Sequence, residues 1–141
     1  MNFVAFIVIV LFVSLSILHF YWAFGGKLGV DKAIPEIDGK PTMEPGAIIT
    51  IAVAVALLGF GGVAYLLGFT DLKSASYGNY VIYSGWFLAG VFALRAIGDF
   101  NVVGFFKKVK SSEFSKYDTK YYSPLCLTLS VLFIALTYEQ A

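Results

Sequence analysis

The sequence is poor in the side chains that most enzymes use for catalysis or metal binding. It has one cysteine, one histidine and one arginine, and only 13% of its 141 residues are charged, well below the roughly 25% of an average soluble domain. A single cysteine, Cys126, excludes an internal disulfide and the paired-thiol chemistry of thiol oxidoreductases. With His19 as the sole histidine, the chain lacks the ligands of a usual zinc site or of a bis-histidine haem. We therefore expect no metal or cofactor.

Long apolar stretches take the place of these residues. The chain is 59% hydrophobic, with a mean hydropathy of +0.81, and a helix crosses a bilayer with about 20 apolar residues. We predict an all-α membrane protein, a single four-helix transmembrane domain over residues 1–141. Its helices are expected over about 3–24, 45–69, 77–106 and 123–138. The first stretch lacks an early Lys or Arg and a small-x-small cleavage site, so we expect it to be retained rather than removed as a signal peptide.

Proline and charged residues suggest where the helices begin and end. Pro45 suits the first turn of the second helix, and Ser123 with Pro124 resembles an N-cap followed by a proline in the first turn of the fourth. The helical pattern of the third stretch continues through Arg95 and Asp99 toward Phe106. This third helix is therefore expected to protrude from the membrane or to end at its surface.

The distribution of lysine predicts the direction of the helices. With four spans, the loops 25–44 and 99–120 share one side of the membrane, and the link between the second and third helices contributes only Lys73 to the other. The lysines of the two loops are Lys27, Lys32, Lys40, Lys107, Lys108, Lys110, Lys116 and Lys120. Since positive loops stay in the cytoplasm, both termini are predicted to lie outside.

Small residues recur at helical spacing on two of the predicted helices. Gly85, Ala89 and Ala93 form such a stripe on the third helix, and Ala52 and Ala56 on the second. Stripes of this kind let helices approach closely. We favour packing within the bundle, and a homodimer contact is the alternative.

His19 is the first candidate for a functional residue. It lies about two turns before the inner end of the first helix, on one face with Trp22. An ionisable side chain at this depth needs a partner or an aqueous cavity, which makes it a functional candidate. The alternative is a neutral, hydrogen-bonded histidine that only ties helices together.

Arg95 and Asp99 are four residues apart, so their side chains can meet on one helical face. They form either a structural ion pair or an anion-binding arginine held by its carboxylate. Glu44 and Asp118 lie at the expected starts of the second and fourth helices, where the helix dipole alone can explain a carboxylate. The functional alternative is one polar pocket open to the cytoplasmic leaflet, lined by His19, Trp22, Glu44, Arg95, Asp99, Asp118 and Tyr122.

The segment around Lys107, Lys108 and Lys110 also contains aromatic residues, among them Phe105, Phe106 and Phe114. This combination is typical of a surface that meets anionic lipids. We therefore expect membrane lipids, and no nucleic acid, as partners of this segment.

Four segments together resemble a known protein family. They are HFYWAFGG at 19–26, PEIDGKPTMEPG at 35–46, RAIGDFNVVGFFKKV at 95–109 and YDTKYYSPLCL at 117–127. As a set, these motifs resemble the four-helix membrane proteins of the domain of unknown function 3995 family. The resemblance implies a multi-pass protein of the bacterial inner membrane and no particular reaction.

Three functions are compatible with these features. The first is a site for a lipid head group or small amphiphile in the predicted pocket. The second is an accessory or structural subunit whose helix faces bind a membrane protein partner. The third is a small dimeric transporter, which is disfavoured because no carboxylate lies within the membrane in any of the four spans. Whether the protein is an enzyme stays open.

Overall fold

Four long apolar helices make up most of the computed structural model, which describes residues 2–38, 40–41, 46–98, 103–110 and 113–141. The first three are α1 (Asn2–Ala23), α3 (Ala47–Phe69) and α4 (Gly78–Ile97). The fourth runs without a break over Phe114–Gln140, through α5 (Glu113–Tyr117), the π-helical turn η1 (Asp118–Tyr122) and α6 (Ser123–Gln140). Each of the four is long and apolar enough to span a membrane, which confirms the predicted number of spans.

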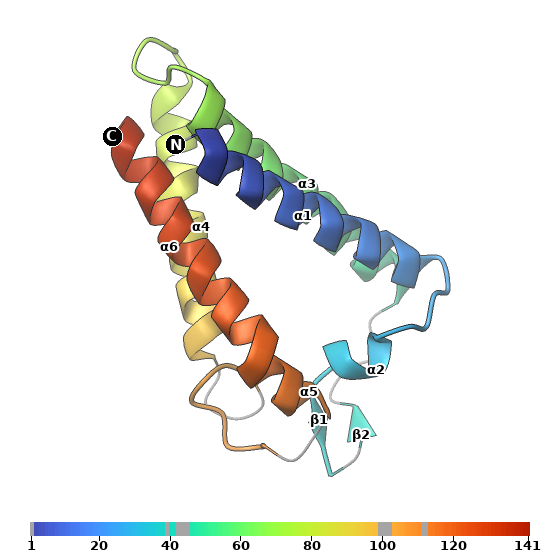
Figure 1. Ribbon diagram of the computed structural model, residues 1–141. Helices are drawn as coiled ribbons and strands as arrows, with labels where there is room; N and C mark the ends of the chain where they lie inside the picture. The colour runs from blue at the N-terminus through green and yellow to red at the C-terminus, as the bar shows by residue number, and fades with distance from the viewer. Residues whose placement is uncertain (1, 39, 42–45, 99–102, 111–112) are drawn as a thin grey trace.

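Short elements occupy the connection between α1 and α3. The single-turn helix α2 (Val30–Ala33) is followed by the strands β1 (Glu36–Ile37) and β2 (Lys40–Pro41). The two strands pair antiparallel, with Glu36 opposite Pro41. We call the end of the molecule that holds α2, β1, β2 and α5 the basic end, and the end that holds both chain termini the terminal end (Figure 1).

The helices are arranged as two pairs that form a wedge. Helix α1 packs chiefly on α3, and α4 chiefly on α6. Figure 1 shows the two pairs close together at the terminal end and spread apart toward the basic end, where α2 and α5 lie between them. The molecule exposes 8383 Å² of surface, whereas a compact chain of this mass would expose about 7,200 Å².

A cluster of four phenylalanines joins the two pairs. Phe12 of α1 contacts Phe60 of α3, Phe92 of α4 and Phe133 of α6, with ring centroids 5.8, 5.6 and 5.9 Å away. Phe12 and Phe133 are fully buried. Each spanning helix contributes one ring, so we call these residues the phenylalanine cluster.

Burial shows where the wedge opens. Among the residues described, α1 has no buried residue after Ser16 and α3 has none before Ala54. Ser16 itself donates a 2.8 Å hydrogen bond to the carbonyl of Ala54, which ties α1 to α3. The half of the α1–α3 pair nearer the basic end therefore has no buried residue among those described.

Two of the predicted helix boundaries were wrong. Helix α4 ends at Ile97 and does not continue to Phe106. The cause is Gly98, which follows with φ +87° and ψ −169° and whose N–H bonds the Leu94 carbonyl. This extended, positive-φ conformation is open essentially only to glycine, and it turns the chain away from the helix.

The fourth helix begins well before the predicted start at 123. Pro124 lies inside it, although a proline removes a backbone donor and crowds the preceding turn. The turn before Pro124 is widened to a π-helix, in which the N–H of Ser123 bonds the carbonyl of Asp118 five residues back. This wider turn accommodates the proline without breaking the helix.

The small-residue stripe of α4 packs inside the chain. Gly85 lies directly against Thr137 of α6, and Ser130 of α6 donates a 2.7 Å hydrogen bond to the Ala89 carbonyl. In contrast, Ala52 and Ala56 of α3 are exposed. Packing within the bundle, the interpretation that we favoured for both stripes, therefore holds for the α4 stripe only.

Candidate functional site

Asp118 is the most heavily coordinated polar side chain at the basic end. Its Oδ1 accepts from Arg95 at 3.1 Å and from the Ser123 hydroxyl at 3.1 Å. Its Oδ2 accepts from the Gly104 N–H at 2.7 Å and lies 3.1 Å from the Lys107 ammonium. An ionised carboxylate has roughly four lone-pair positions, so these four donors saturate it. Asp118 is fully buried, and burial of a charge requires such partners. We call these five residues the Asp118 cluster.

Two glycines bring the cluster together. The N–H of Phe105 bonds the carbonyl of Ala96, which closes the loop after α4 back onto the helix end. At this crossing Gly98 and Gly104 both have positive φ, and a Cβ on Gly98 would lie 1.8 Å from the Val103 carbonyl oxygen. Only glycine fits such an approach. The crossing turns the N–H of Gly104 and the side chain of Lys107 toward Asp118.

Lys107 corrects the prediction of a wholly exposed lysine segment. It is 3% exposed, and its ammonium contacts Asp118, the Gly104 carbonyl and the Thr119 hydroxyl. An ammonium has about three donors, so Lys107 has none left over. Phe114 is also buried, whereas Phe106, Lys108 and Lys110 are exposed. Only part of this segment is therefore available to lipid.

Arg95 is the member of the cluster that reaches the surface. Its side chain is 31% exposed, against 0% for Asp118 and 1% for Lys107. A guanidinium carries several N–H donors in a rigid fork, and among the described residues Arg95 uses Nη1 on Asp118. Arg95 is thus oriented by a saturated carboxylate, and part of its side chain reaches the surface. This geometry suits an anion.

Trp22 and Tyr122 both bond the segment between α1 and β1, one from each helix pair. Trp22 Nε1 donates 2.9 Å to the Leu28 carbonyl, and Leu28 N donates 3.4 Å to the Tyr21 hydroxyl. Across the wedge, the Tyr122 hydroxyl donates 3.0 Å to the Lys32 carbonyl, and the Lys32 ammonium lies 5.2 Å from the Tyr117 ring centroid. A neutral hydrogen bond and an exposed cation–π contact each contribute about 1 kcal/mol.

His19 bonds to its own helix. Its Nδ1 lies 2.7 Å from the Leu15 carbonyl, and its ring packs edge-on against Trp22 at 5.0 Å. When Nδ1 carries the proton it donates to Leu15, and Nε2 is then an acceptor. The half-buried ring lies on the same helical face as Phe12 and Ser16, which continues into the open part of the wedge.

The structure therefore divides the seven predicted site residues. Arg95 and Asp118 meet in the cluster, and His19 and Trp22 meet on α1. Tyr122 bonds the α2 segment, and the ends of α1 and α4 lie on separate arms of the wedge (Figure 1). Glu44 and Asp99 lie outside the described residues.

The motifs of one protein family extend over nearly all of these elements. The sequence pattern of the family described as protein of unknown function, DUF3995, matches residues 12–133. The chain belongs to the DUF3995 family. No curated protein and no solved structure matches it.

The matched range of this DUF3995 chain includes the whole Asp118 cluster and the whole phenylalanine cluster, together with His19, Tyr21 and Trp22 of α1. The family description adds no reaction. The functional interpretation therefore depends on geometry alone.

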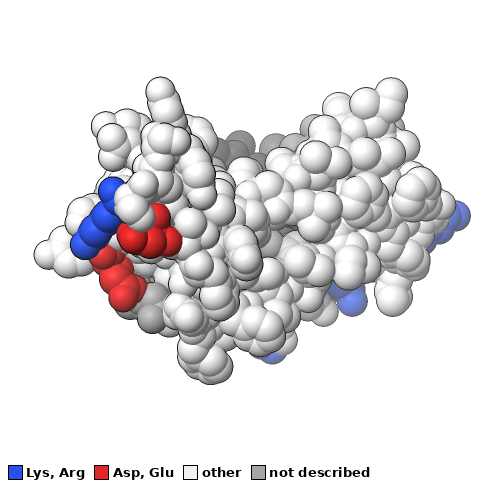
Figure 2. All heavy atoms as spheres, turned by 90° about the horizontal axis from the view of Figure 1, so that it is seen from above, with Lys and Arg blue, Asp and Glu red and all other residues white. Residues whose placement is uncertain are grey.

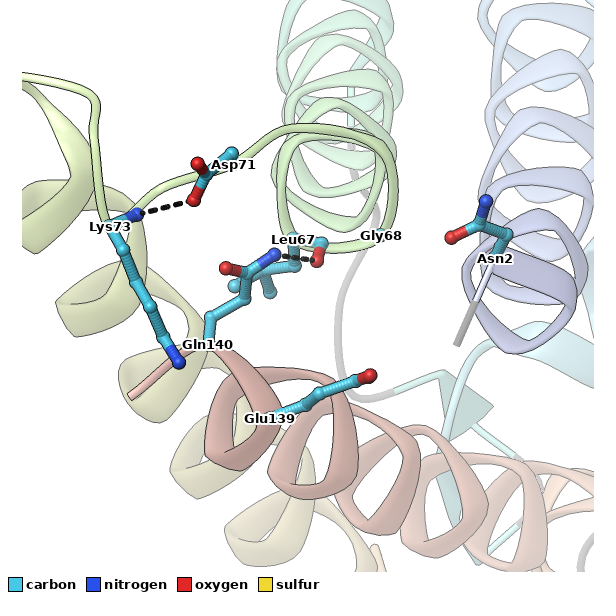
Figure 3. Close-up of a pocket in the computed structure, with 7 residues that line it drawn as sticks. All are labelled: Asn2, Leu67, Gly68, Asp71, Lys73, Glu139 and Gln140. Carbon is cyan, nitrogen blue, oxygen red and sulfur yellow. Dashed lines mark hydrogen bonds between the residues drawn. The ribbon is translucent and has the colours of Figure 1, made fainter.

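A cavity of about 300 Å³ lies at the opposite, terminal end of the DUF3995 chain. Figure 3 shows its lining, which is Asn2, Leu67, Gly68, Asp71, Lys73, Glu139 and Gln140. None of these is a predicted site residue. The Gln140 amide bonds the carbonyls of Leu67 and Thr70 at 2.8 and 2.9 Å, which caps the end of α3.

The charged side chains of this cavity are surface residues. Asp71, Lys73 and Glu139 are all exposed, and Figure 2, which looks onto the terminal end, shows charge gathered on one side of a mostly uncharged surface. Exposed, rotatable side chains do not preorganise a site. We therefore place the candidate site at Arg95.

Sequence reasoning missed Lys107, Gly104 and Ser123 as partners of Asp118. The glycines at 98 and 104 signal a tight loop, but nothing in the sequence separates Lys107 from its neighbours Lys108 and Lys110. The contact that distinguishes it is made only when the loop folds back onto η1.

Proposed function

We propose that this protein is a multi-pass protein of a bacterial inner membrane that binds the anionic head group of a lipid or small amphiphile at Arg95. The two termini face outward in this proposal, since the lysine-rich loops would lie in the cytoplasm. Bound at the end of α4, the head group would lie at the level of the inner leaflet, with its apolar tail between or beside the helix pairs.

The observation that carries the proposal is the state of Arg95. It is held at one nitrogen by a carboxylate that already has its full set of donors, and it is 31% exposed. An arginine that served only to neutralise Asp118 would be redundant beside Lys107. Charge-assisted bonds from a guanidinium fork are well matched to phosphate and carboxylate groups.

Lipid retention tests this proposal. The wild type, Arg95→Gln, Arg95→Lys and Lys27→Gln are purified in mild detergent, and co-purified phospholipid is measured by mass spectrometry. Lys27 is an exposed lysine at the same end, outside the segment around Lys108, and serves as the matched control. We expect several-fold less anionic phospholipid on Arg95→Gln, little change on Lys27→Gln and partial retention on Arg95→Lys.

Thermal unfolding of the same samples separates binding from stability. If Arg95→Gln unfolds earlier and still keeps the wild-type lipids, Arg95 is structural and the proposal fails. His19→Ala, measured in parallel, reports whether the α1 arm contributes to binding. Loss of stability in both variants with no change of lipid would assign the polar residues to helix packing.

An accessory subunit is the second candidate function, and one observation favours it. Ala52, Ala56, Gly59 and Gly62 are exposed on α3, and a Cβ on Gly59 or Gly62 would meet open space. A lipid-facing surface of small residues lets another helix approach closely. Cross-linking after Gly59→Leu, with Gly90→Leu on α4 as the control, tests it: a partner band that persists in Gly59→Leu counts against this candidate.

A further inference from the structure

The segment from Phe24 to Ala33, which we call the strap, connects the two helix pairs at the basic end. On the α1 side, both backbone groups of Leu28 are held by aromatic side chains, the N–H by Tyr21 and the carbonyl by Trp22. Backbone bonds from Gly25 to Trp22 and from Gly26 to Tyr21 add to this anchor. A Cβ on Gly26 would lie 2.3 Å from the Tyr21 ring, so a larger residue here would displace that ring. This end of the strap is firmly attached.

On the other side, the strap meets the fourth helix through α2. The Tyr122 hydroxyl donates to the Lys32 carbonyl at 3.0 Å, across 90 positions of sequence. The Lys32 ammonium covers the Tyr117 ring at 5.2 Å, and α2 packs on α5. The bond from Tyr122 and the contact from Lys32 each depend on a side chain. On the strap they involve a helix of only four residues.

Among the described residues, α2 with the residues next to it and α5 make the contact between the pairs at this end, where Pro35, Phe114 and Ser115 are buried. The phenylalanine cluster joins them further toward the terminal end, and no described residue of α1 after Ser16 or of α3 before Ala54 is buried. Figure 1 shows α2 and α5 as the elements that lie between the spread arms. The angle of the wedge is therefore set by the contacts from the phenylalanine cluster to the terminal end, where Gln140 of α6 bonds the end of α3, and by the strap at its open end.

We propose that the strap is a releasable tether, with Tyr122 and Lys32 as its latch, that controls how far the α1–α3 pair separates from the α4–α6 pair. Release of the latch leaves the strap attached to α1 and frees the arms to move about the phenylalanine cluster. Tyr122 lies four residues after Asp118 on the same helix, so the latch and the Asp118 cluster share one rigid element. Latch release then regulates the access of lipid to Arg95, a role that rests on the proposed function.

Spin-label distances test the tether without any ligand. Labels are placed at Ile17→Cys on α1 and Leu127→Cys on α6, which are 63% and 47% exposed, in a Cys126→Ser background in phosphatidylcholine nanodiscs. Tyr122→Phe removes the latch hydroxyl and keeps the ring. Tyr121→Phe is the control, because Tyr121 is an exposed tyrosine on the same turn.

We expect Tyr122→Phe to raise the ratio of long to short distances about two- to ten-fold, which corresponds to the loss of one hydrogen bond, and Tyr121→Phe to leave it unchanged. Lys32→Gln, which keeps the carbonyl and removes the cation over Tyr117, should shift the ratio in the same direction. Lys32→Gln also provides the test of the latch if Tyr122→Phe folds poorly. Identical distances in wild type, Tyr122→Phe and Lys32→Gln overturn the proposal, as does an equal shift in Tyr121→Phe.

Addition of phosphatidylglycerol to the nanodiscs separates this proposal from the proposed function. A distance change on addition that is absent in Arg95→Gln supports regulated access. If the latch variants shift the distances but phosphatidylglycerol acts equally on wild type and Arg95→Gln, the tether stands and the Arg95 site fails. If lipid retention depends on Arg95 but the latch variants change no distance, the tether fails and the site stands.

Discussion

Asp118 accepts two donors on each oxygen while fully buried. Its partners come from α4, from the loop that follows α4 and from the first turn of α6, so one carboxylate joins three segments of the chain. A buried ion pair can be neutral overall relative to apolar packing, but removal of one partner leaves an uncompensated charge. The cost of losing Asp118 is therefore larger than the cost of losing an exposed charge.

We predict that Asp118→Asn lowers the free energy of unfolding by about 3 kcal/mol. The amide cannot compensate Lys107, which is 1% exposed in its side chain, and cannot accept from all four donors. Equilibrium unfolding in detergent micelles measures the effect. Lys108→Met, which removes an exposed charge from the same loop, should change stability by less than about 0.5 kcal/mol. Equal losses in the two variants would contradict a special role for the buried cluster.

Asp71 shows the opposite case, a fully exposed carboxylate. The Ser74 hydroxyl, at 2.7 Å, and the Lys73 N–H, at 3.1 Å, both donate to it and lower the pKa of Asp71 below its ordinary value of 3.8. Hydrogen bonds to the charged form have this effect. Because the folded-state pKa is depressed, the stability from Asp71 is present above pH 3.8 and is lost as the pH falls through the lower folded-state pKa.

The expected result is a pH-dependent difference between wild type and Asp71→Asn. The difference in melting temperature should stay constant from pH 8 to pH 5 and should shrink as the pH is lowered below 3.8. Ser74→Ala removes the larger of the two contributions and should reduce the difference over the same range. A difference that instead changes between pH 8 and pH 5 would assign the effect to another group.

Helices α4 and α6 show how closely two elements approach in this fold. A Cβ on Gly85 would lie 2.2 Å from Thr137 Oγ1, and this hydroxyl is buried without a conventional partner among the described residues. Glycine is thus needed at position 85 for the space that it leaves to this hydroxyl.

Gly85→Ala is predicted to destabilise the protein by about 1–3 kcal/mol through overpacking of this interface. Gly90→Ala, in the same helix and with nothing within 4 Å of the added Cβ, should be neutral or slightly stabilising, since alanine favours a helix. Thermal unfolding compares the two. Thr137→Ala added to Gly85→Ala should recover part of the loss, and the absence of any recovery would exclude a clash with Oγ1.

The four long helices were predictable because each is encoded by one continuous apolar stretch of the sequence. All four spans follow from the lack of charge in stretches that a bilayer requires to be apolar. Their ends were less predictable. Ser123 and Pro124 have the residue types of a helix start, but the π-helical turn before them lets the helix continue.

The polar contacts were predicted poorly because they join distant positions. A spacing of four residues favoured a pairing of Arg95 with Asp99, which lies outside the described residues, and gave no sign of the observed pair of Arg95 and Asp118, which are 23 positions apart. The sequence pattern did select both Arg95 and Asp118 as site candidates. Their pairing depends on a backbone crossing at Gly98 and Gly104, and no periodic pattern encodes that.

At the scale of the whole molecule, the phenylalanine cluster brings together rings from all four long apolar helices. The rings of Phe92 and Phe133 are stacked with centroids 6.3 Å apart, and Phe60 meets Phe92 edge-on at 6.1 Å. Aromatic pairs of this geometry contribute about 0.5–1.5 kcal/mol beyond the area that they bury. The cluster therefore holds the two helix pairs together.

We predict that Phe12→Ala lowers the free energy of unfolding by about 3–5 kcal/mol, the usual cost of deleting a buried phenylalanine ring. Phe6→Ala removes the same ring from the same helix at a position that is 57% exposed, and should cost much less. Unfolding in detergent compares the variants. Similar losses at the two positions would show that the cluster does not join the pairs.

The wedge also affects the membrane around it. Placed in a bilayer, a bundle whose arms meet at one end and spread at the other displaces a larger area in one leaflet than in the other. Its insertion is then easiest where the leaflet around the broad end is expanded, that is, where the bilayer curves toward that end. If the four helices span a bilayer, the separation of the two helix pairs in one small chain thus becomes a preference for membrane curvature.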